Sequence, residues 1–577
     1  MSAEKKEKCF NEMTGAEIFV KCLEMEGVEI MFGIPGGQVL PIFDKLYDSK
    51  IKFILTRHEQ GAAHMADGYA RATGKVGVCL ATSGPGATNL VTGIANAYMD
   101  SIPVVAFTGQ VPTTLIGNDA FQEADITGVT RPVTKHNYLV KSVKDLARTI
   151  REAFYVAKTG RPGPVLVDIP SDVQRAKTEF IWPKDVEMVS YRPTYKGHPG
   201  QIKKLAQAIN EAKQPVLYVG GGVISSNAST ELIELATKCH IPVTTTLLAI
   251  GAFPSDNELS LGMLGMHGTA YANKAIQMTD LLISVGARFD DRCTGKLSAF
   301  APKAKHIAHI DIDPTSISKN VFADIPVVGD CKAVLQDLLK EVKPKKHTDW
   351  INQIKKLKQE FPLKYTKDEK LRPQYVIEEI SQLTKGEAIL VTEVGQHQMW
   401  SAQYYKASAP RKFLSSGGLG TMGFGFPAGI GAKFAKPKEK VIVIAGDGSF
   451  QMNIQELATA SINKVNVIVC ILNNSFLGMV RQWQQLFYNK RYSYTQLCTH
   501  SHDPKKCPVP DFVKVVEAYG GVGFRVVEKS EVVPTLKKAF EIKDKPVVID
   551  FIVEDEENVF PMVPAGASLD EIMINLA

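Results

Sequence analysis

The sequence predicts an α/β protein with three doubly wound parallel-sheet domains. Short apolar runs rich in Val and Ile alternate along the chain with segments of helical period, a pattern typical of buried parallel strands joined by helices. Glycine-rich turns follow many of these runs, where strands would end. With 577 residues, the chain has room for roughly three to four domains.

Changes in composition along the chain suggest where one domain ends and the next begins. We expect the first domain at residues 11–185, the second at 195–345 and the third at 370–565. A polar, proline-containing stretch from Gln174 to Gly200 indicates the first linker. A lysine-rich stretch from Lys340 to Lys370 is interpreted as a solvated helix and linker.

Composition and charge exclude several classes of function. The formal charge of +6 is small for this length, and no dense Lys/Arg cluster is interleaved with aromatic residues, so we expect no nucleic-acid partner. No apolar run approaches the roughly 20 residues of a membrane span. The start, MSAEKKEKCF, lacks the apolar core of a secretory signal. The nine scattered cysteines indicate reduced thiols, so the sequence predicts a cytoplasmic protein.

The stretch from Val441 to Asn474 carries the most specific local pattern. An apolar run, VIVIA, turns at Gly446-Asp447-Gly448, passes through a helical period and returns as a second apolar run that ends on two asparagines. This order predicts a βαβ unit with both strands buried in a parallel sheet. Asp447 and Asn474 would then lie at the carboxyl ends of parallel strands, where such sheets bind ligands. Their oxygens suit Mg²⁺, and the glycines would let backbone approach a diphosphate.

A single GDG is compatible with an ordinary βα turn, but the spacing is more informative. GDG followed by 24 residues and then NN resembles the thiamine-diphosphate/Mg²⁺ motif of the decarboxylase-like thiamine enzymes. The resemblance implies that Asp447, Asn474 and the backbone carbonyl of Phe476 hold the metal.

The segment RHEQGAAHMADGYARATG, residues 57–74, places a carboxylate at another strand end. Glu59 follows an apolar run and precedes a helix of small residues. One interpretation is a first-turn acid that the helix dipole favours. The segment also resembles the catalytic-glutamate segment of thiamine enzymes. That resemblance implies that Glu59, buried among Ala and Gly, protonates the aminopyrimidine ring of the cofactor.

The second block repeats the alternation of strands and helices, with PVLYVGGGV, PVTTTL, LLISVGARFDDR and HIAHIDID as its strands and their exits. It could be a purely structural copy of the first block. However, Arg288 and Arg292 are well placed to meet phosphate or ribose, and Asp311 on the next strand could accept a hydroxyl.

From Thr14 to about Asp570 the chain resembles the catalytic subunits of the acetohydroxyacid synthases, also called acetolactate synthases. The matching segments include FGIPGG, TSGPGATNLVTGIANAY, GQVPTTLIGNDAFQEAD, LGMHGTAYAN, EVGQHQMWSAQYY and LGMVRQWQQLFY. The resemblance implies a transferase that decarboxylates pyruvate on thiamine diphosphate. The hydroxyethyl unit then condenses with pyruvate, giving 2-acetolactate, or with 2-oxobutyrate, giving 2-aceto-2-hydroxybutyrate. This is the first common step of valine, leucine and isoleucine biosynthesis.

The resemblance also implies the cofactors and the assembly. The three domains would bind the pyrimidine ring, FAD and the Mg²⁺-diphosphate group, and FAD would have no redox task. Thiamine diphosphate would lie between the first domain of one subunit and the third domain of another. The expected partners are therefore the two 2-oxo acid substrates, further copies in a homodimer or homotetramer, and a small regulatory subunit.

Carried over residue by residue, the resemblance assigns three groups of side chains. The catalytic group is Glu59, Gly37, Gln122, Met422 and Trp483. The thiamine-diphosphate group is Glu59, Val394, Gly395, Gln396, His397, Met422, Gly446, Gly448, Ser449 and Met479, with Asp447, Asn474 and Phe476 on the metal. The FAD group is Arg161, Gly220, Gly221, Gly222, Thr246, Leu247, Met266, His267, Gly286, Arg288, Asp290, Arg292, Asp311 and Asp330.

A fourth set of residues would surround the substrates: Gly37, Phe121, Gln122, Arg292 and Trp483. Pro112, Ala120, Arg292 and Trp483 match positions where sulfonylurea and imidazolinone herbicides bind in the family.

Three other functions are compatible with parts of the pattern. An FAD-using pyruvate oxidase shares the GDG–NN and glutamate motifs, although VGARFDDR and LGMVRQWQ argue against it. A catabolic, flavin-free acetolactate synthase is a nearer alternative. A non-catalytic binding module would not need every motif residue.

The segment CTHSHDPKKC, Cys498 to Cys507, has no counterpart in the family pattern. Its Cys, His and Asp side chains could suit Zn²⁺, or the two cysteines could pair, but the spacing fits no standard zinc motif. We expect a plain solvated loop that supplies no catalytic group.

Overall fold

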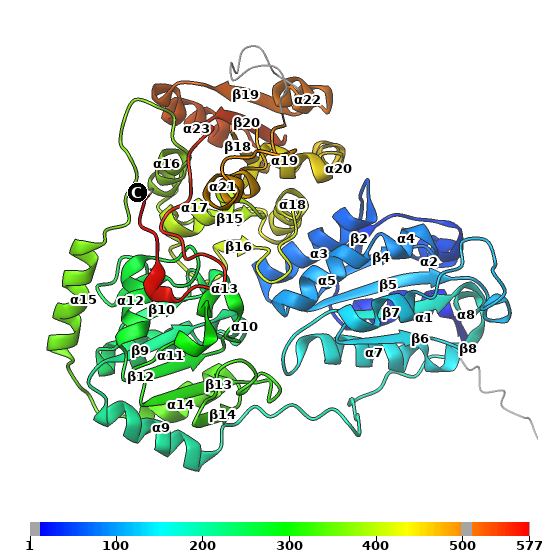
Figure 1. Ribbon diagram of the computed structural model, residues 1–577. Helices are drawn as coiled ribbons and strands as arrows, with labels where there is room; N and C mark the ends of the chain where they lie inside the picture. The colour runs from blue at the N-terminus through cyan, green and yellow to red at the C-terminus, as the bar shows by residue number, and fades with distance from the viewer. Residues whose placement is uncertain (1–11, 498–509, 576–577) are drawn as a thin grey trace, which may run out of the picture. The chain divides into compact units, whose positions relative to one another are not determined.

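Figure 1 shows the computed structural model, which describes residues 12–497 and 510–575. It contains three six-stranded sheets in which every neighbouring pair of strands is parallel. The predicted fold class is confirmed. The chain forms two compact units: the first extends to Tyr191 and holds one sheet, and the second begins at Arg192 and holds the other two. The segment from Cys498 to Cys507, which we expect to be a solvated loop, lies outside the described residues.

The first sheet has the strand order β3-β2-β4-β5-β7-β6. Its strands are β2 (Ile30–Gly33), β3 (Lys52–Leu55), β4 (Gly77–Ala81), β5 (Val104–Gln110), β6 (His136–Leu139) and β7 (Val165–Pro170). Its longer helices are α1 (Gly15–Met25), α2 (Leu40–Tyr47), α3 (Glu59–Thr73), α5 (Val91–Asp100) and α7 (Val143–Lys158). A short antiparallel pair, β1 (Glu12–Thr14) with β8 (Lys177–Glu179), was not predicted.

Two local signals explain where helices of the first unit begin. Thr14 and Glu17 form a capping box at the start of α1, which satisfies backbone N–H groups that the first turn leaves free. Ser142 caps α7, and the buried residues Leu146, Ile150 and Phe154 of that helix recur every four positions. This spacing gives α7 one apolar face, which packs on the sheet together with α1.

The second sheet has the order β11-β10-β9-β12-β13-β14. Its strands are β9 (Pro215–Val219), β10 (Val243–Thr245), β11 (Ser260–Met263), β12 (Leu281–Val285), β13 (His306–Asp311) and β14 (Ile325–Val328). Counted along the chain this is 3-2-1-4-5-6, the order of dinucleotide-binding sheets, which bind their ligand where the order reverses, here between β9 and β12. Helices α9 (Pro199–Glu211), α11 (Ser229–Cys239) and α14 (Cys331–Glu341) cover one face, and α12 (Ala270–Met278) and α15 (Thr348–Glu360) cover the other.

Helix α15 corrects the interpretation of the lysine-rich stretch as solvated throughout. Trp350 is 1% exposed, and its Nε1 donates to the carbonyl of Pro215, 3.1 Å away. Ile351 and Ile354 are buried beside it. The lysines occupy only the outer side of the helix, because the apolar side is needed to cover the second sheet.

The third sheet has the order β16-β15-β17-β18-β20-β19. Its strands are β15 (Ile389–Thr392), β16 (Phe413–Ser415), β17 (Val441–Gly446), β18 (Ile468–Asn473), β19 (Val522–Val526) and β20 (Val547–Ile552). Its helices include α16 (Pro373–Thr384), α17 (Gln396–Tyr404), α18 (Gly425–Ala435), α19 (Asp447–Phe450), α20 (Glu456–Ile462), α21 (Gly478–Phe487), α22 (Phe512–Ala518) and α23 (Val532–Glu541). The predicted βαβ unit is confirmed, since β17 and β18 are adjacent and parallel, with Gly446 opposite Leu472.

After β20 the chain leaves the third sheet and runs back to the second. The backbone N–H of Val563 donates to the carbonyl of Met266, 2.7 Å away, and that of Lys296 donates to Ala567, 2.9 Å away. This C-terminal segment, residues 553–575, therefore connects the carboxyl edges of the two sheets. The domain boundaries at 11–185, 195–345 and 370–565 stay predictions. In the part of the chain that the structure describes, no helix combines the length and apolar character that a membrane crossing needs.

Candidate active site

The carboxyl edge of the third sheet brings the predicted metal ligands together. Asp447 begins α19 directly after β17, and Asn474 directly follows β18. Both side chains are buried, with 5% and 8% exposure. Asn473 is used elsewhere, because its Nδ2 donates to Asp550 Oδ1 at 2.9 Å. The second asparagine of the pair is thus the one available at the edge beside Asp447.

The electrostatics of Asp447 suit a cation. Burial, followed by the charge of Asp550, raises the pKa of Asp447 to about 7, against the opposing backbone N–H groups of Gly448 and Ser475. A buried carboxylate is costly unless a positive charge compensates it. A divalent cation beside Asp447 would keep it ionised. Among the described residues no cluster of three or more His, Cys, Asp or Glu side chains could hold a metal, so an ion here would also need amide and carbonyl oxygens.

A second turn, residues 393–397, adjoins the GDG turn. His397 is 6% exposed, and burial lowers its pKa to about 3. Its Nε2 has no hydrogen-bond partner among the described residues. The ring packs against Gly446, where a Cβ would come within 3.1 Å of His397 Nδ1. A buried ring nitrogen without a partner calls for a polar ligand, which a diphosphate would supply.

Further predicted residues meet at the same place. A Cβ at Gly448 would lie 4.0 Å from Met422 Cε, and one at Gly420 would lie 3.9 Å from Val394. Ser449 accepts a hydrogen bond from the backbone N–H of Gly446 at 3.2 Å. The third sheet therefore gathers Val394, His397, Met422, Gly446, Gly448, Ser449, Asp447 and Asn474 at one edge.

Helix α21 leaves this edge and carries two more predicted residues. Met479 packs partly buried against the core of the third sheet. Trp483 is half-buried one turn further along. Phe476, whose carbonyl is a predicted metal ligand, lies just before this helix and is 8% exposed.

In the first unit, Glu59 begins α3 four residues after the end of β3, as predicted. Its Oε2 accepts a hydrogen bond from Asn89 Nδ2 at 3.0 Å. A Cβ at Gly86 would lie 3.5 Å from Glu59 Oε1. The expected burial among small residues is only partly found, because Glu59 is half-buried. The turn that carries Gly86 and Asn89 covers one side of the carboxylate and leaves the rest open.

The loop after β5 holds the predicted substrate residues Phe121 and Gln122. Gln122 has a left-handed backbone, with φ +59°, and a Cβ at Gly84 would lie 2.8 Å from the Gln122 carbonyl oxygen. The turn that contacts Glu59 thus also contacts Gln122. Phe121 is 85% exposed, and Gly37, after β2, has open space where a side chain would be. Pro112 and Ala120 flank the same loop.

The predicted FAD residues of the second unit all follow strands of the second sheet. Gly220, Gly221 and Gly222 follow β9; Thr246 and Leu247 follow β10; Met266 and His267 follow β11; Gly286, Arg288, Asp290 and Arg292 follow β12; Asp311 ends β13; and Asp330 follows β14. Because all six strands are parallel, these residues share the carboxyl edge. The glycines at β9 and β12 sit where the strand order reverses.

At the ends of β9 and β12 the backbone packs too closely for any residue larger than glycine. A Cβ at Gly220 would lie 2.1 Å from the carbonyl oxygen of Gly286, and one at Gly222 would lie 2.7 Å from Gly286 Cα. His267 is 5% exposed, its Nδ1 has no partner among the described residues, and burial lowers its pKa to about 4. The predicted FAD residue Arg161 belongs to the first unit, where its Nε donates to Ser101 at 2.8 Å.

The structure also reveals polar residues that sequence reasoning missed. Asn89 orients Glu59, and Glu393 accepts hydrogen bonds from the backbone N–H groups of Gly423 and Gly425, at 2.6 and 3.3 Å. Gln482 is fully buried and hydrogen-bonds Gln396. All three lie inside segments that match the family, TSGPGATN, EVGQHQMW and LGMVRQWQQLFY, but the sequence does not reveal the partners of Gln482.

Comparison with known proteins identifies what the chain is similar to. Three family models match it: the N-terminal thiamine pyrophosphate binding domain of thiamine pyrophosphate enzymes at residues 13–129, their central domain at 202–338 and their C-terminal thiamine pyrophosphate binding domain at 393–551. The chain is 53% identical over 570 residues to an acetolactate synthase of Mycobacterium bovis, covering 97% of this chain and 91% of that protein.

Two other relatives are similar over nearly the same length. An acetolactate synthase large subunit of Corynebacterium glutamicum is 52% identical, with 98% of this chain and 90% of that protein covered. A probable acetolactate synthase large subunit of Methanocaldococcus jannaschii is 51% identical, with coverage of 97% and 95%.

Proposed function

Because the chain belongs to the acetolactate synthase family of thiamine pyrophosphate enzymes, we propose that Glu59, Asp447 and Asn474 form the centre of its thiamine-diphosphate site. The activity is acetolactate synthesis. Pyruvate loses carbon dioxide, and the remaining two-carbon unit joins a second pyruvate, giving 2-acetolactate, or 2-oxobutyrate, giving 2-aceto-2-hydroxybutyrate. The enzyme thus catalyses the first common step of branched-chain amino-acid biosynthesis.

The observation that carries the site assignment is the buried carboxylate of Asp447 beside Asn474 at adjacent strand ends. Mg²⁺ would compensate that charge, with the Asn474 side-chain oxygen and the Phe476 carbonyl completing the protein's share of ligands. Such an ion keeps positions free for diphosphate oxygens. The diphosphate would then lie among Val394, Gly395, Gln396, His397, Gly446, Gly448 and Ser449. It would give a polar neighbour to the His397 ring nitrogen that has no partner among the described residues.

The protein's residues bind, orient and move a proton, while the cofactor carries the hard chemistry. When bound, thiamine diphosphate supplies the electron sink that lets carbon dioxide leave pyruvate. Glu59 exchanges a proton with the aminopyrimidine ring, and Asn89 orients its carboxylate for that exchange. Met422 would support the rings of the bound cofactor. Gly37, Phe121, Gln122, Arg292 and Trp483 surround the two substrates.

We assign FAD to the carboxyl edge of the second sheet. The dinucleotide-type strand order, the glycines at its reversal point and the buried His267 support this assignment. Arg288 and Arg292 would meet the phosphates or ribose, and Asp311 would accept a hydrogen bond from a hydroxyl. FAD has a structural rather than a redox task.

We propose that the active assembly contains at least two copies of the chain, as in the family that the sequence resembles. Glu59 belongs to one compact unit and Asp447 to the other, and we infer that a homodimer or homotetramer unites Glu59 of one copy with Asp447 of another. Relatives named as large subunits support a separate small regulatory subunit. We place the protein in the cytoplasm.

An acetolactate assay with each cofactor omitted in turn tests this function. We expect activity to require thiamine diphosphate and Mg²⁺, and the purified protein to show a flavin absorption spectrum. A colourless, fully active protein would instead identify the flavin-free type of acetolactate synthase. Pyruvate-dependent peroxide formation or quinone reduction would contradict the non-redox task of FAD.

A further inference from the structure

We propose that Gln482 is a positioning residue of the metal site, which fixes the side-chain amide of Gln396 and, through it, directs the Asn474 oxygen toward the ion. The inference rests on the proposed Mg²⁺ site and names residues that act behind its ligands. It follows from the direction of a chain of hydrogen bonds among buried amides.

The chain of hydrogen bonds begins at Val559 in the C-terminal segment. The backbone of Val559 allows the side-chain amide of Gln482 only one orientation. Gln482 Nε2 donates to the Val559 carbonyl at 3.0 Å, and Gln482 Oε1 accepts from the Val559 N–H at 2.8 Å. An amide turned the other way would set oxygen against oxygen and nitrogen against nitrogen. Because a backbone N–H can only donate and a carbonyl can only accept, the direction of this first link is determined.

The second hydrogen bond, between Gln482 and Gln396, determines the orientation of the Gln396 amide. With its oxygen fixed, Gln482 can only accept there, and it accepts from Gln396 Nε2 at 2.9 Å. The same nitrogen donates to the backbone carbonyl of Glu557 at 3.0 Å. Two acceptors on one side therefore require that side of Gln396 to be its nitrogen, and Gln396 Oε1 must point the other way.

The third link reaches the predicted metal ligand. Gln396 Oε1 accepts a hydrogen bond from Asn474 Nδ2 at 3.2 Å. The nitrogen of the Asn474 amide is thereby engaged, and its oxygen is turned away from Gln396. That oxygen accepts from the Phe476 N–H at 3.1 Å and retains a lone pair for an ion, because an amide oxygen has two.

The packing around the chain allows little adjustment. Gln396, Gln482 and Asn474 are 3%, 0% and 8% exposed. A Cβ at Gly478 would lie 2.1 Å from Gln396 Oε1 and 2.7 Å from Asn474 Nδ2, so only glycine leaves room for this link. In a buried polar network each lost hydrogen bond is costly, since water cannot replace it.

This arrangement differs from the role first expected of Gln396, which was to line the diphosphate. Its side chain instead lies between the metal ligand and helix α21, and only its backbone remains for the diphosphate. Residues that hold a metal ligand in place typically change metal affinity by about 10–100-fold when mutated.

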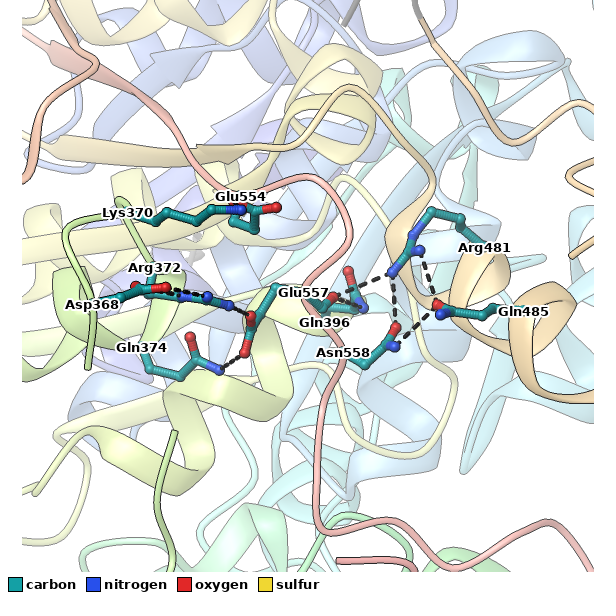
Figure 2. Close-up of polar contacts among 10 residues, drawn as sticks. All are labelled: Asp368, Lys370, Arg372, Gln374, Gln396, Arg481, Gln485, Glu554, Glu557 and Asn558. Carbon is teal, nitrogen blue, oxygen red and sulfur yellow. Dashed lines mark hydrogen bonds and ion pairs between the residues drawn. The ribbon is translucent and has the colours of Figure 1, made fainter. Parts of the chain in front are cut away.

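The same helix offers a matched control, which Figure 2 shows. Gln485 accepts hydrogen bonds from Arg481 Nη1 at 3.1 Å and from Asn558 Nδ2 at 3.0 Å. It thus also joins α21 to the C-terminal segment, one residue from Val559, but it has no hydrogen bond to Gln396. Replacing it removes a comparable contact and leaves the amide chain complete.

Gln482→Met, Gln482→Glu and Gln485→Met test the proposal. Binding of Mg²⁺ to the cofactor-free protein, with thiamine diphosphate in excess, is measured by titration calorimetry. We expect Gln482→Met to weaken Mg²⁺ binding about 10–100-fold and Gln485→Met to leave it within about twofold. Gln482→Glu keeps the acceptor for Gln396 but places a carboxylate oxygen against the Val559 carbonyl, so we expect a smaller loss that still exceeds that of Gln485→Met.

Melting temperatures and circular dichroism establish whether each variant is folded. If Gln482→Met does not fold, the Mg²⁺ affinity of Gln482→Glu tests the proposal. Unchanged Mg²⁺ affinity in the folded Gln482 variants, or an equal loss in Gln485→Met, would overturn the proposal. A wild-type protein that binds no Mg²⁺ with thiamine diphosphate would overturn the proposed metal site itself, and the inference with it.

Discussion

The first and third sheets have the same strand order, counted along the chain as 2-1-3-4-6-5, yet their carboxyl edges differ in kind. At the third sheet the polar residues Asp447, Asn474 and His397 are enclosed, at most 8% exposed, although residues around them such as Met422 and Trp483 are half-buried. At the first sheet they are open, since Glu59 is half-buried and Phe121 is 85% exposed.

The difference indicates that the strand order places candidate residues at the carboxyl edge of each sheet, whereas the side chains there determine what that edge can bind. The enclosed edge suits holding an ion and a diphosphate, because burial strengthens each charge interaction there. The open edge suits presenting an acid and substrate contacts to a ligand held elsewhere. We therefore expect substitutions at the open edge to reduce turnover and substitutions at the enclosed edge to reduce cofactor binding.

Glu59→Gln should give the largest effect on turnover, a loss of about 10²–10⁴-fold in acetolactate formation, because a neutral amide cannot exchange the proton. Thiamine-diphosphate affinity and FAD content should stay near wild type. Steady-state assays with parallel calorimetry measure both quantities. Activity within about twofold of wild type would remove Glu59 from its assigned role.

Asp447→Asn should show the opposite signature at the enclosed edge. Losing the charged ligand should weaken Mg²⁺ binding by roughly 100-fold or more, because residues that only support a ligand already contribute up to about 100-fold. High Mg²⁺ concentration should then restore part of the turnover, whereas it should not rescue Glu59→Gln. If added Mg²⁺ rescued both variants alike, the division of tasks between the two edges would be wrong.

Trp483→Leu tests whether the enclosed edge also selects the second substrate. One methylene against an apolar surface is worth roughly 10–200-fold in selectivity. The substitution should therefore decrease the preference for 2-oxobutyrate over pyruvate by a factor within that range. Competition assays with both acceptors measure the product ratio. An unchanged ratio would assign the preference to the open edge, where Phe121 becomes the next candidate.

Two buried carboxylates outside the proposed ligands, Asp168 at the first sheet and Glu393 at the third, give the smallest effect, a pH dependence of stability. Burial raises the pKa of Asp168 to about 7, against hydrogen bonds from Thr108 and Gln110 at 2.7 and 3.0 Å. A folded pKa above the unfolded value means that folding takes up a proton. The stability that Asp168 contributes therefore falls as pH rises from about 4 to 7, and is constant above.

Asp168→Asn removes this titration and retains both hydrogen bonds, since the Thr108 hydroxyl can also accept. Relative to wild type, the variant should gain about 2 kcal/mol between pH 5.5 and pH 8. Denaturation midpoints at the two pH values measure the gain. Glu393→Gln in the third sheet should show the same direction, because burial raises the pKa of Glu393 to about 7 as well. A pH-independent difference in both variants would mean that neither carboxyl titrates in this range.

The sequence by itself determined the fold class and the strand ends at which the candidate site residues lie. Buried parallel strands require continuous apolar runs, so VIVIA and the run before Asn473 marked β17 and β18 directly. Asp447, Asn474 and Glu59 lie within a few residues of such runs, and a strand end is a local property. The dinucleotide-type order of the second sheet was not predicted, because strand order depends on which apolar faces meet in three dimensions.

Only the tertiary structure decided how those residues are held. Gln482 contacts Gln396 across 86 residues and Val559 across 77, and an amide in a helix has no periodicity that reveals such partners. Trp350 likewise lay in a lysine-rich stretch that suggested a solvated helix. Side-chain hydrogen bonds and burial depend on neighbours that are distant in sequence, whereas strands, turns and the residues at their ends depend on neighbours that are near.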